Sequence, residues 1–228
     1  VNGALIPKIM ETANMTETSV KNANIKKPLM IMRCDGGVMT VEEVRKRPIL
    51  TMLSGLAAGV AGALMYEKVS DGIFFEVGGT STDISVIKDG KVMIKNAEVG
   101  GHKLYLTSLD VRTLGIAGGS MIVVENGKIV DVGPRSAHIA DKEYEIFADE
   151  SKMSNPKVKY IAPRKDDKAN YVAIECDNGY SYALTVAGAA NILGYVPEND
   201  YARGNDKAGR KAWEVLAKEI GISVEEAC

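Results

Sequence analysis

Two acidic residues flank a short turn of glycines and hydroxyl side chains in the first half of the sequence. Glu76 lies near the end of an apolar run typical of a buried strand, and Asp83 begins an alternating run typical of the next strand. Glycines let backbone amides point at a phosphate, and hydroxyls add further hydrogen bonds. The turn is therefore predicted to bind a phosphate through Gly78, Gly79, Thr80, Ser81 and Thr82.

The flanking carboxylates suit the chemistry that phosphoryl transfer needs. A carboxylate can hold Mg²⁺ directly or through water, and it can orient an attacking water. Glu76 and Asp83 are the predicted catalytic pair, and Glu76 and Asp110 are the predicted metal ligands. Capping of the next turn explains Asp110 equally well. Taken alone, the glycine turn also has a purely structural explanation, as a tight hairpin whose hydroxyls saturate their own backbone.

A second glycine cluster follows at residues 115–120, just before a predicted hairpin. It could face the same ligand as the first turn. Its last three residues, Gly118, Gly119 and Ser120, are therefore predicted to lie close to that ligand.

Helices and strands alternate along the chain and must position these residues. Apolar residues at helical spacing predict helices over residues 4–13, 41–47, 54–65, 183–193 and 206–220, the first ending near Asn14. Strands are predicted over residues 28–33, 73–77, 83–87, 91–94, 121–124, 128–130 and 171–174. Asp89-Gly90 and Asn126-Gly127 are typical hairpin turns. The first of them leads to the prediction of a three-stranded meander over residues 73–94.

Composition is that of an ordinary globular protein. With 228 residues, 46% of them hydrophobic, the chain can form a core without disulfides. A net charge of -2 argues against nucleic-acid and anionic-membrane partners, and no apolar stretch approaches the ~20 residues of a membrane span. The three cysteines form no CxxC pair, which favours a cytoplasmic location. The chain begins without methionine and closes on a helical pattern, so both ends are expected to be cuts in a longer polypeptide.

Several further blocks accompany the two glycine clusters in a fixed order. They lie at residues 32–37, 53–60, 76–83, 110–120, 132–137, 190–194 and 223–227. Together the blocks resemble the hydantoinase/oxoprolinase family, which includes the N-methylhydantoinase large subunit and acetone carboxylase relatives. The resemblance extends over most of the chain.

The resemblance implies an α/β fold of the actin-like ATPase (ribonuclease H-like) type, with a mixed β-sheet flanked by helices. It assigns residues 1–141 and 183–228 to the ATPase lobe. Residues 142–182, where charged residues surround short β-like runs, are expected to form a β-rich surface extension. The N-terminal lobe, with the family's first phosphate motif, is expected to lie outside this chain.

The resemblance also implies a function. In that family ATP activates a cyclic amide such as a hydantoin or 5-oxoproline, because phosphorylating the amide oxygen exposes the ring carbon to water. The chain is thus predicted to belong to an ATP-dependent cyclic amide hydrolase that uses ATP and Mg²⁺. A small cyclic amide, a second hydantoinase subunit or domain, and further copies of the chain are the expected partners.

Three positions depart from the family pattern and leave alternatives open. Glu76 stands where Asp is usual, residues 138–142 replace a glycine-proline-cysteine segment, and Ala189 stands where an Asp often precedes Ala-Asn. Carboxylation of a ketone is one alternative reaction. An actin-like nucleotide-binding module that regulates or reactivates another protein is the alternative function, and a plain interaction domain is a third.

Overall fold

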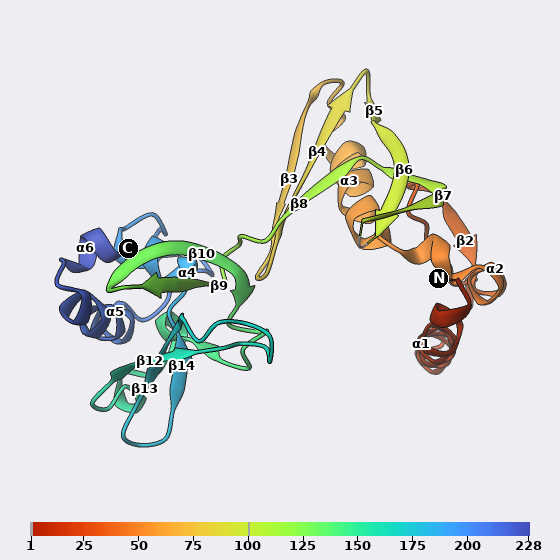
Figure 1. The fold of residues 1–228 in the computed structure, drawn as a ribbon. Coiled ribbons are helices and arrows are strands. Elements are labelled where there is room, and N and C mark those ends of the chain that lie inside the picture. Colours follow the sequence, from red (N-terminus) through yellow and green to blue (C-terminus); the bar gives the residue numbers. More distant parts are fainter. Residues whose placement is uncertain (1, 100) are drawn as a thin grey trace. The chain divides into compact units, whose positions relative to one another are not determined.

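The computed structural model describes residues 2–99 and 101–228, which divide into two compact units (Figure 1). The first unit comprises Val1–Glu76 and Asp83–Arg112, and the second comprises Val77–Thr82 and Thr113–Cys228. The boundaries between the units therefore fall in the strands on either side of the glycine turn, and the turn itself belongs to the second unit.

The first part of the chain alternates helices with short antiparallel strands. In order, its elements are α1 (Asn2–Asn22), β1 (Met30–Met32), β2 (Val38–Thr40), α2 (Val41–Lys46), the 3-10 helix η1 (Pro48–Thr51), α3 (Ser54–Glu67), β3 (Gly72–Val77), β4 (Thr82–Lys88), β5 (Lys91–Val92), β6 (Ile94–Val99), β7 (His102–Leu109) and β8 (Val111–Leu114). Strands β3, β4 and β5 neighbour one another in chain order, which confirms the predicted meander, and β8 also pairs with β4. Strands β1 and β2 form one hairpin, and β6 and β7 form another.

Two elements of this part have other bounds than the sequence predicted. Helix α1 runs on to Asn22, well beyond the predicted end near Asn14. The hydroxyls of Thr16, Thr18 and Ser19 donate to carbonyls four residues earlier, so these polar side chains find their partners within the helix. The single strand predicted over residues 91–94 is broken at Met93, whose carbonyl accepts a hydrogen bond from the Asp110 amide at 2.7 Å.

The core of the first unit forms where α3 packs on the sheet. Ala57 and Val60 of α3 are fully buried and cluster with Leu109, and Phe74 of β3 packs against them. The small residues of this helix allow that close approach. A Cβ placed on Gly59 would lie 3.3 Å from the Phe74 ring.

The second unit contains a mixed sheet with helices packed against it. Its elements are β9 (Ser120–Glu125), β10 (Lys128–Ser136), β11 (Glu143–Tyr144), the 3-10 helices η2 (Glu145–Phe147) and η3 (Glu150–Lys152), β12 (Lys157–Ile161), β13 (Tyr171–Glu175), β14 (Ser181–Ala183), α4 (Val186–Ile192), α5 (Asp206–Ile220) and α6 (Val224–Ala227). The sheet order is β10-β9-β13-β14-β11, with β12 also paired to β13. All pairs are antiparallel except β11 with β14.

The core of this unit lies between the sheet and α5. Trp213 and Leu216 of α5 are fully buried and cluster with Val172 and Ile174 of β13. Residues 142–182, expected to form a surface extension, thus supply a buried strand within the sheet. Helices α5 and α6 lie side by side (Figure 1). None of the helices in the described part of the chain combines the length and apolar character needed to cross a bilayer.

Candidate nucleotide-phosphate site

The structure joins the two glycine clusters directly within the second unit. The Gly118 amide donates to the Gly78 carbonyl at 3.2 Å, and the Gly119 amide donates to the Gly79 carbonyl at 2.9 Å. The second cluster is itself held by the Ala187 amide, which donates to the Gly118 carbonyl at 2.8 Å. The turn at residues 78–82 therefore rests on a hydrogen-bonded support.

One amide of the turn is engaged within the turn itself, and the next three are not. The Gly78 amide donates to the Ser81 carbonyl at 3.0 Å and closes the turn. The amides of Gly79, Thr80 and Ser81 have no hydrogen-bond acceptor among the described residues. Successive amides of this kind are what an anion-binding turn offers.

Several hydroxyls near the turn are engaged within the protein. Thr82 Oγ1 donates to the Ile116 carbonyl at 2.6 Å, and Ser120 Oγ is buried and accepts from the Ala117 amide at 2.9 Å. Thr80 Oγ1 lies 3.1 Å from Ser136 Oγ. These bonds fix the ends of both clusters. Sequence reasoning did not foresee them.

The predicted carboxylates belong to the first unit. Glu76 Oε2 lies where a Cβ on Gly59 of α3 would stand, so this side chain points at the helix. Asp83 is buried, and the Asp110 carboxylate forms an ion pair with Lys95 at 2.6 Å. No three His, Cys, Asp or Glu side chains gather into a metal-binding group within residues 2–99 and 101–228. The catalytic and metal roles of these carboxylates stay predictions.

The sequence of this chain matches a family model over its whole length. The model, described as hydantoinase/oxoprolinase, matches residues 1–228. This chain belongs to the hydantoinase/oxoprolinase family. The predicted resemblance is thereby confirmed.

Curated relatives of this family member include two kinds of amide hydrolase. Caprolactamase subunit alpha of Pseudomonas jessenii is 26% identical, and the alignment covers 100% of this chain and 30% of the relative. The 5-oxoprolinase of Saccharomyces cerevisiae is 31% identical over 58% of this chain and 10% of its own length. The chain thus spans at most 30% of the length of either relative.

Two solved structures share the fold of this family member. Nucleotide-free acetone carboxylase matches 94% of this chain and 27% of its own with a TM-score of 0.66 and 20% identity. The ATP-dependent caprolactamase from Pseudomonas jessenii matches 98% of this chain and 29% of its own with a TM-score of 0.59 and 22% identity. The predicted α/β class, with a mixed β-sheet and helices, is confirmed by the described elements and by these two matches.

A buried carboxylate that sequence reasoning missed lies in the second unit of this hydantoinase/oxoprolinase chain. Glu145 is fully buried, and its Oε1 accepts from Trp213 Nε1 at 2.8 Å and from the Thr185 amide at 3.3 Å. Its Oε2 accepts from Thr185 Oγ1 at 3.0 Å. A buried indole N–H needs an acceptor, so Trp213 at core spacing was the signal that could have pointed to such a partner.

The position of this carboxylate bears on one of the departures from the family pattern. Ala189, which the resemblance places where an aspartate is often found, lies on helix α4. Glu145 places a carboxylate against the same helix, because a Cβ on Gly188 would overlap Glu145 Oε1. An acidic group thus reaches α4 from a different element.

Burial of Glu145 leads to a pH prediction. Burial raises the pKa of Glu145 from 4.5 to about 7, although the donors from Trp213 and Thr185 act in the opposite direction. Between these values the unfolded chain has lost the proton that the folded unit still holds. The contribution of Glu145 to the free energy of unfolding should therefore be fully present below the unfolded pKa, fall by about 3 kcal/mol as the pH rises to about 7, and stay level above it.

Denaturation followed by the fluorescence of Trp213, the one tryptophan in the sequence, would measure this dependence at about pH 4.5 and about pH 8. Glu145→Gln removes the titrating proton, so most of the fall should disappear in that variant. Glu150→Gln, at an exposed position, should behave as the wild type does. An equal fall of the free energy of unfolding in wild type and Glu145→Gln would contradict the assignment of this pH dependence to Glu145.

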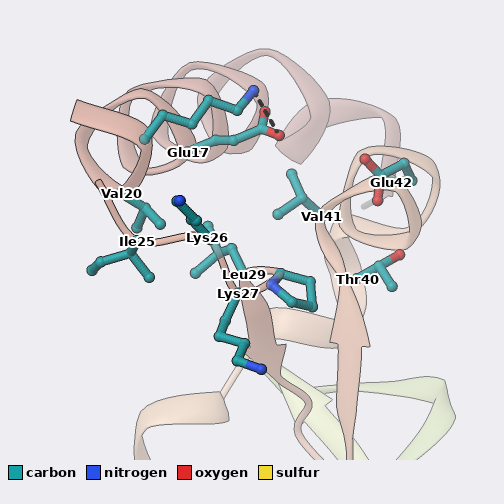
Figure 2. Close-up of a pocket in the computed structure, with 11 residues that line it drawn as sticks. Glu17, Val20, Ile25, Lys26, Lys27, Leu29, Thr40, Val41 and Glu42 are labelled. Atoms are coloured by element: carbon teal, nitrogen blue, oxygen red, sulfur yellow. Dashed lines mark ion pairs between the residues drawn. The ribbon is translucent and has the colours of Figure 1, made fainter. Parts of the chain in front are cut away.

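A pocket of about 500 Å³ lies elsewhere, in the first unit beside α1 and α2 (Figure 2). Apolar side chains such as Val20 and Val41 share its lining with Lys26, and Lys21 pairs with Glu17 at 3.4 Å along one side. None of the predicted nucleotide-binding residues lines it. This pocket and the candidate site therefore share no residue.

Proposed function

We propose that this chain is the nucleotide-facing part of an ATP-dependent hydrolase that opens a small cyclic amide or imide of the hydantoin or 5-oxoproline type. One observation carries the proposal: the amides of Gly79, Thr80 and Ser81 lack acceptors among the described residues, on a turn whose position is fixed by hydrogen bonds. Family membership supports it, since the caprolactamase and 5-oxoprolinase relatives are named for cyclic amides.

The chemistry of the turn fits a nucleotide phosphate. Amides that donate to an anionic oxygen form hydrogen bonds roughly twice as strong as neutral ones. The three available amides are proposed to hold phosphate oxygens, while Gly118, Gly119 and Ser120 support the turn and border the nucleotide. ATP, when bound, supplies the phosphoryl group that makes an amide carbon susceptible to water.

The acidic residues are assigned proposed roles beside this turn. Glu76 and Asp83 are proposed to act on Mg²⁺ and on the attacking water, and Asp110 is proposed as a further metal ligand released from Lys95. Carboxylate oxygens are the ligands that Mg²⁺ prefers, which supports this assignment.

A second subunit or domain is proposed to complete the enzyme. The caprolactamase relative is a subunit alpha, and the chain spans only 30% of its length. The substrate is proposed to bind with the help of that additional polypeptide. Self-association of the chain is part of the same proposal.

Substrate-dependent ATP turnover tests the function. The natural protein that contains this sequence would be incubated with Mg-ATP and, separately, hydantoin, 5-oxoproline and caprolactam, and both phosphate release and ring-opened product would be measured. We expect at least one cyclic amide to raise phosphate release together with an equimolar amount of product. ATP turnover that no cyclic amide alters would contradict the proposal, and omission of ATP is the control.

A further inference from the structure

We propose that the hydroxyl of Tyr144 is an additional ligand of the phosphate held by the turn, donating a hydrogen bond to the same anion as the amides of Gly79, Thr80 and Ser81. The inference rests on the proposed function, because it adds a side chain to that phosphate site. It concerns only residues of the second unit.

The phenol oxygen of Tyr144 lies against both glycine clusters at once. A Cβ placed on Gly79 would lie 3.2 Å from Tyr144 Oη, and a Cβ placed on Gly119 would overlap this oxygen. Glycine at both positions therefore leaves room for a hydroxyl beside the turn. A group that approaches the Gly79 amide comes within reach of the phenol.

The Tyr144 hydroxyl has no hydrogen-bond partner among the described residues. The side chain is half-buried, and burial, followed by the neighbouring Glu145, raises the pKa of its phenol. The hydroxyl therefore keeps its proton at neutral pH and is available as a donor. A half-buried donor without a partner can form its hydrogen bond with an acceptor atom that the ligand brings.

The surrounding structure fixes Tyr144 before any ligand binds. Strand β11 pairs Tyr144 with Ala183, and the ring stacks on Phe147 with centroids 5.8 Å apart. The next residue, Glu145, is tied by hydrogen bonds to Thr185 and Trp213. Little conformational entropy then remains to be lost when the hydroxyl meets an anion.

A purely packing role for the ring makes a different prediction, because phenylalanine would serve it as well. Mg-ADP binding would be measured by isothermal titration calorimetry for wild type, Tyr144→Phe and Tyr195→Phe. Tyr144→Phe would lose a hydrogen bond to a charged group, so its affinity for Mg-ADP should be about 10- to 100-fold weaker than that of wild type. Tyr195 is 77% exposed, so its phenylalanine variant should match wild type.

A second readout separates ligand contact from packing in a protein of unchanged shape. With 3-fluorotyrosine at position 144, the phenol titrates in ¹⁹F spectra, and bound Mg-ADP should raise its pKa, because a neighbouring anion opposes the phenolate. A phenol that only packs would titrate alike with and without nucleotide.

The outcomes distinguish this inference from the proposed function. Wild-type protein that binds no Mg-ADP would overturn both. If wild type and Tyr144→Phe bound Mg-ADP equally well, and nucleotide left the phenol pKa in the ¹⁹F titration unchanged, only the role of Tyr144 would be overturned. Weaker binding by Tyr144→Phe and a raised phenol pKa would support it.

Discussion

Replacing Gly188 by alanine is expected to destabilise the second unit by about 3 kcal/mol, a large effect for the addition of one methyl group. A Cβ at this position would overlap Glu145 Oε1, and it would lie 2.6 Å from the carboxyl carbon and 3.1 Å from Trp213 Nε1. Glu145 is fully buried and cannot swing into solvent. The carboxylate must then give up its hydrogen bonds or α4 must move.

Chemical denaturation followed by Trp213 fluorescence would measure this loss. The matched control is Gly62→Ala in α3, where no heavy atom lies within 4 Å of the added Cβ. By helix propensity this control should leave the chain as stable as before or stabilise it by up to about 1 kcal/mol, as followed by circular dichroism. If Gly188→Ala unfolded at the same midpoint denaturant concentration as wild type, the contact between Gly188 and Glu145 would not be as close as described.

Gly119→Ala is expected to weaken nucleotide binding by about 100-fold or more, which corresponds to the loss of two charge-assisted hydrogen bonds. The added Cβ would overlap Tyr144 Oη and lie 2.5 Å from the Gly79 carbonyl oxygen, which is backbone and cannot rotate aside. The hydrogen bond from Gly119 to Gly79 would break, and the turn would shift as a unit. The proposed grip of the Gly79, Thr80 and Ser81 amides on one anion would then be lost.

Gly179→Asn provides a matched control for this variant. Gly179 belongs to the same unit, has a φ of +87°, and has no heavy atom within 4 Å of an added Cβ. Asparagine tolerates that backbone conformation better than other side chains do. Mg-ADP affinity should remain at the wild-type value in Gly179→Asn. If Gly119→Ala bound Mg-ADP as tightly as wild type, the hydrogen bonds from Gly118 and Gly119 would not be needed to hold the turn for the nucleotide.

Much of the secondary structure could be predicted because its signals are local. Helix α5 shows apolar spacing, begins after the cap Asn205 and ends at Gly221 with a φ of +74°. The Asp89-Gly90 and Asn126-Gly127 turns connect β4 to β5 and β9 to β10 as predicted. A turn or a cap is determined by a few neighbouring residues, so single-sequence reasoning reaches it.

Other features depend on residues far apart in the chain and escaped prediction. The pairing of Glu145 with Trp213 joins residues that no local pattern connects, and the space for it comes from Gly188. Residues 171–174 were predicted as a strand, but their pairing within the sheet beside β9 could not be read from the surrounding charge. Long-range packing decides such contacts, and periodicity does not encode it.

The candidate site was predicted in part. Sequence reasoning selected both glycine clusters, and the structure joins them by hydrogen bonds from Gly118 and Gly119. It did not foresee that those two amides are consumed by that contact, nor that Tyr144 lies beside the turn. The nucleotide-binding role of the clusters stays a prediction.

Amide NMR of the ¹⁵N-labelled chain, titrated with Mg-ADP, would show directly whether the turn holds the nucleotide, and Gly119→Ala is titrated in parallel. If the turn holds a nucleotide phosphate, the amides of Gly79, Thr80 and Ser81 should show the largest shifts, whereas those of Gly118 and Gly119, already hydrogen-bonded, should shift less. In Gly119→Ala these shifts should vanish at the same nucleotide concentration. Saturable Mg-ADP binding that leaves the resonances of the three turn amides unshifted would contradict phosphate binding by the turn.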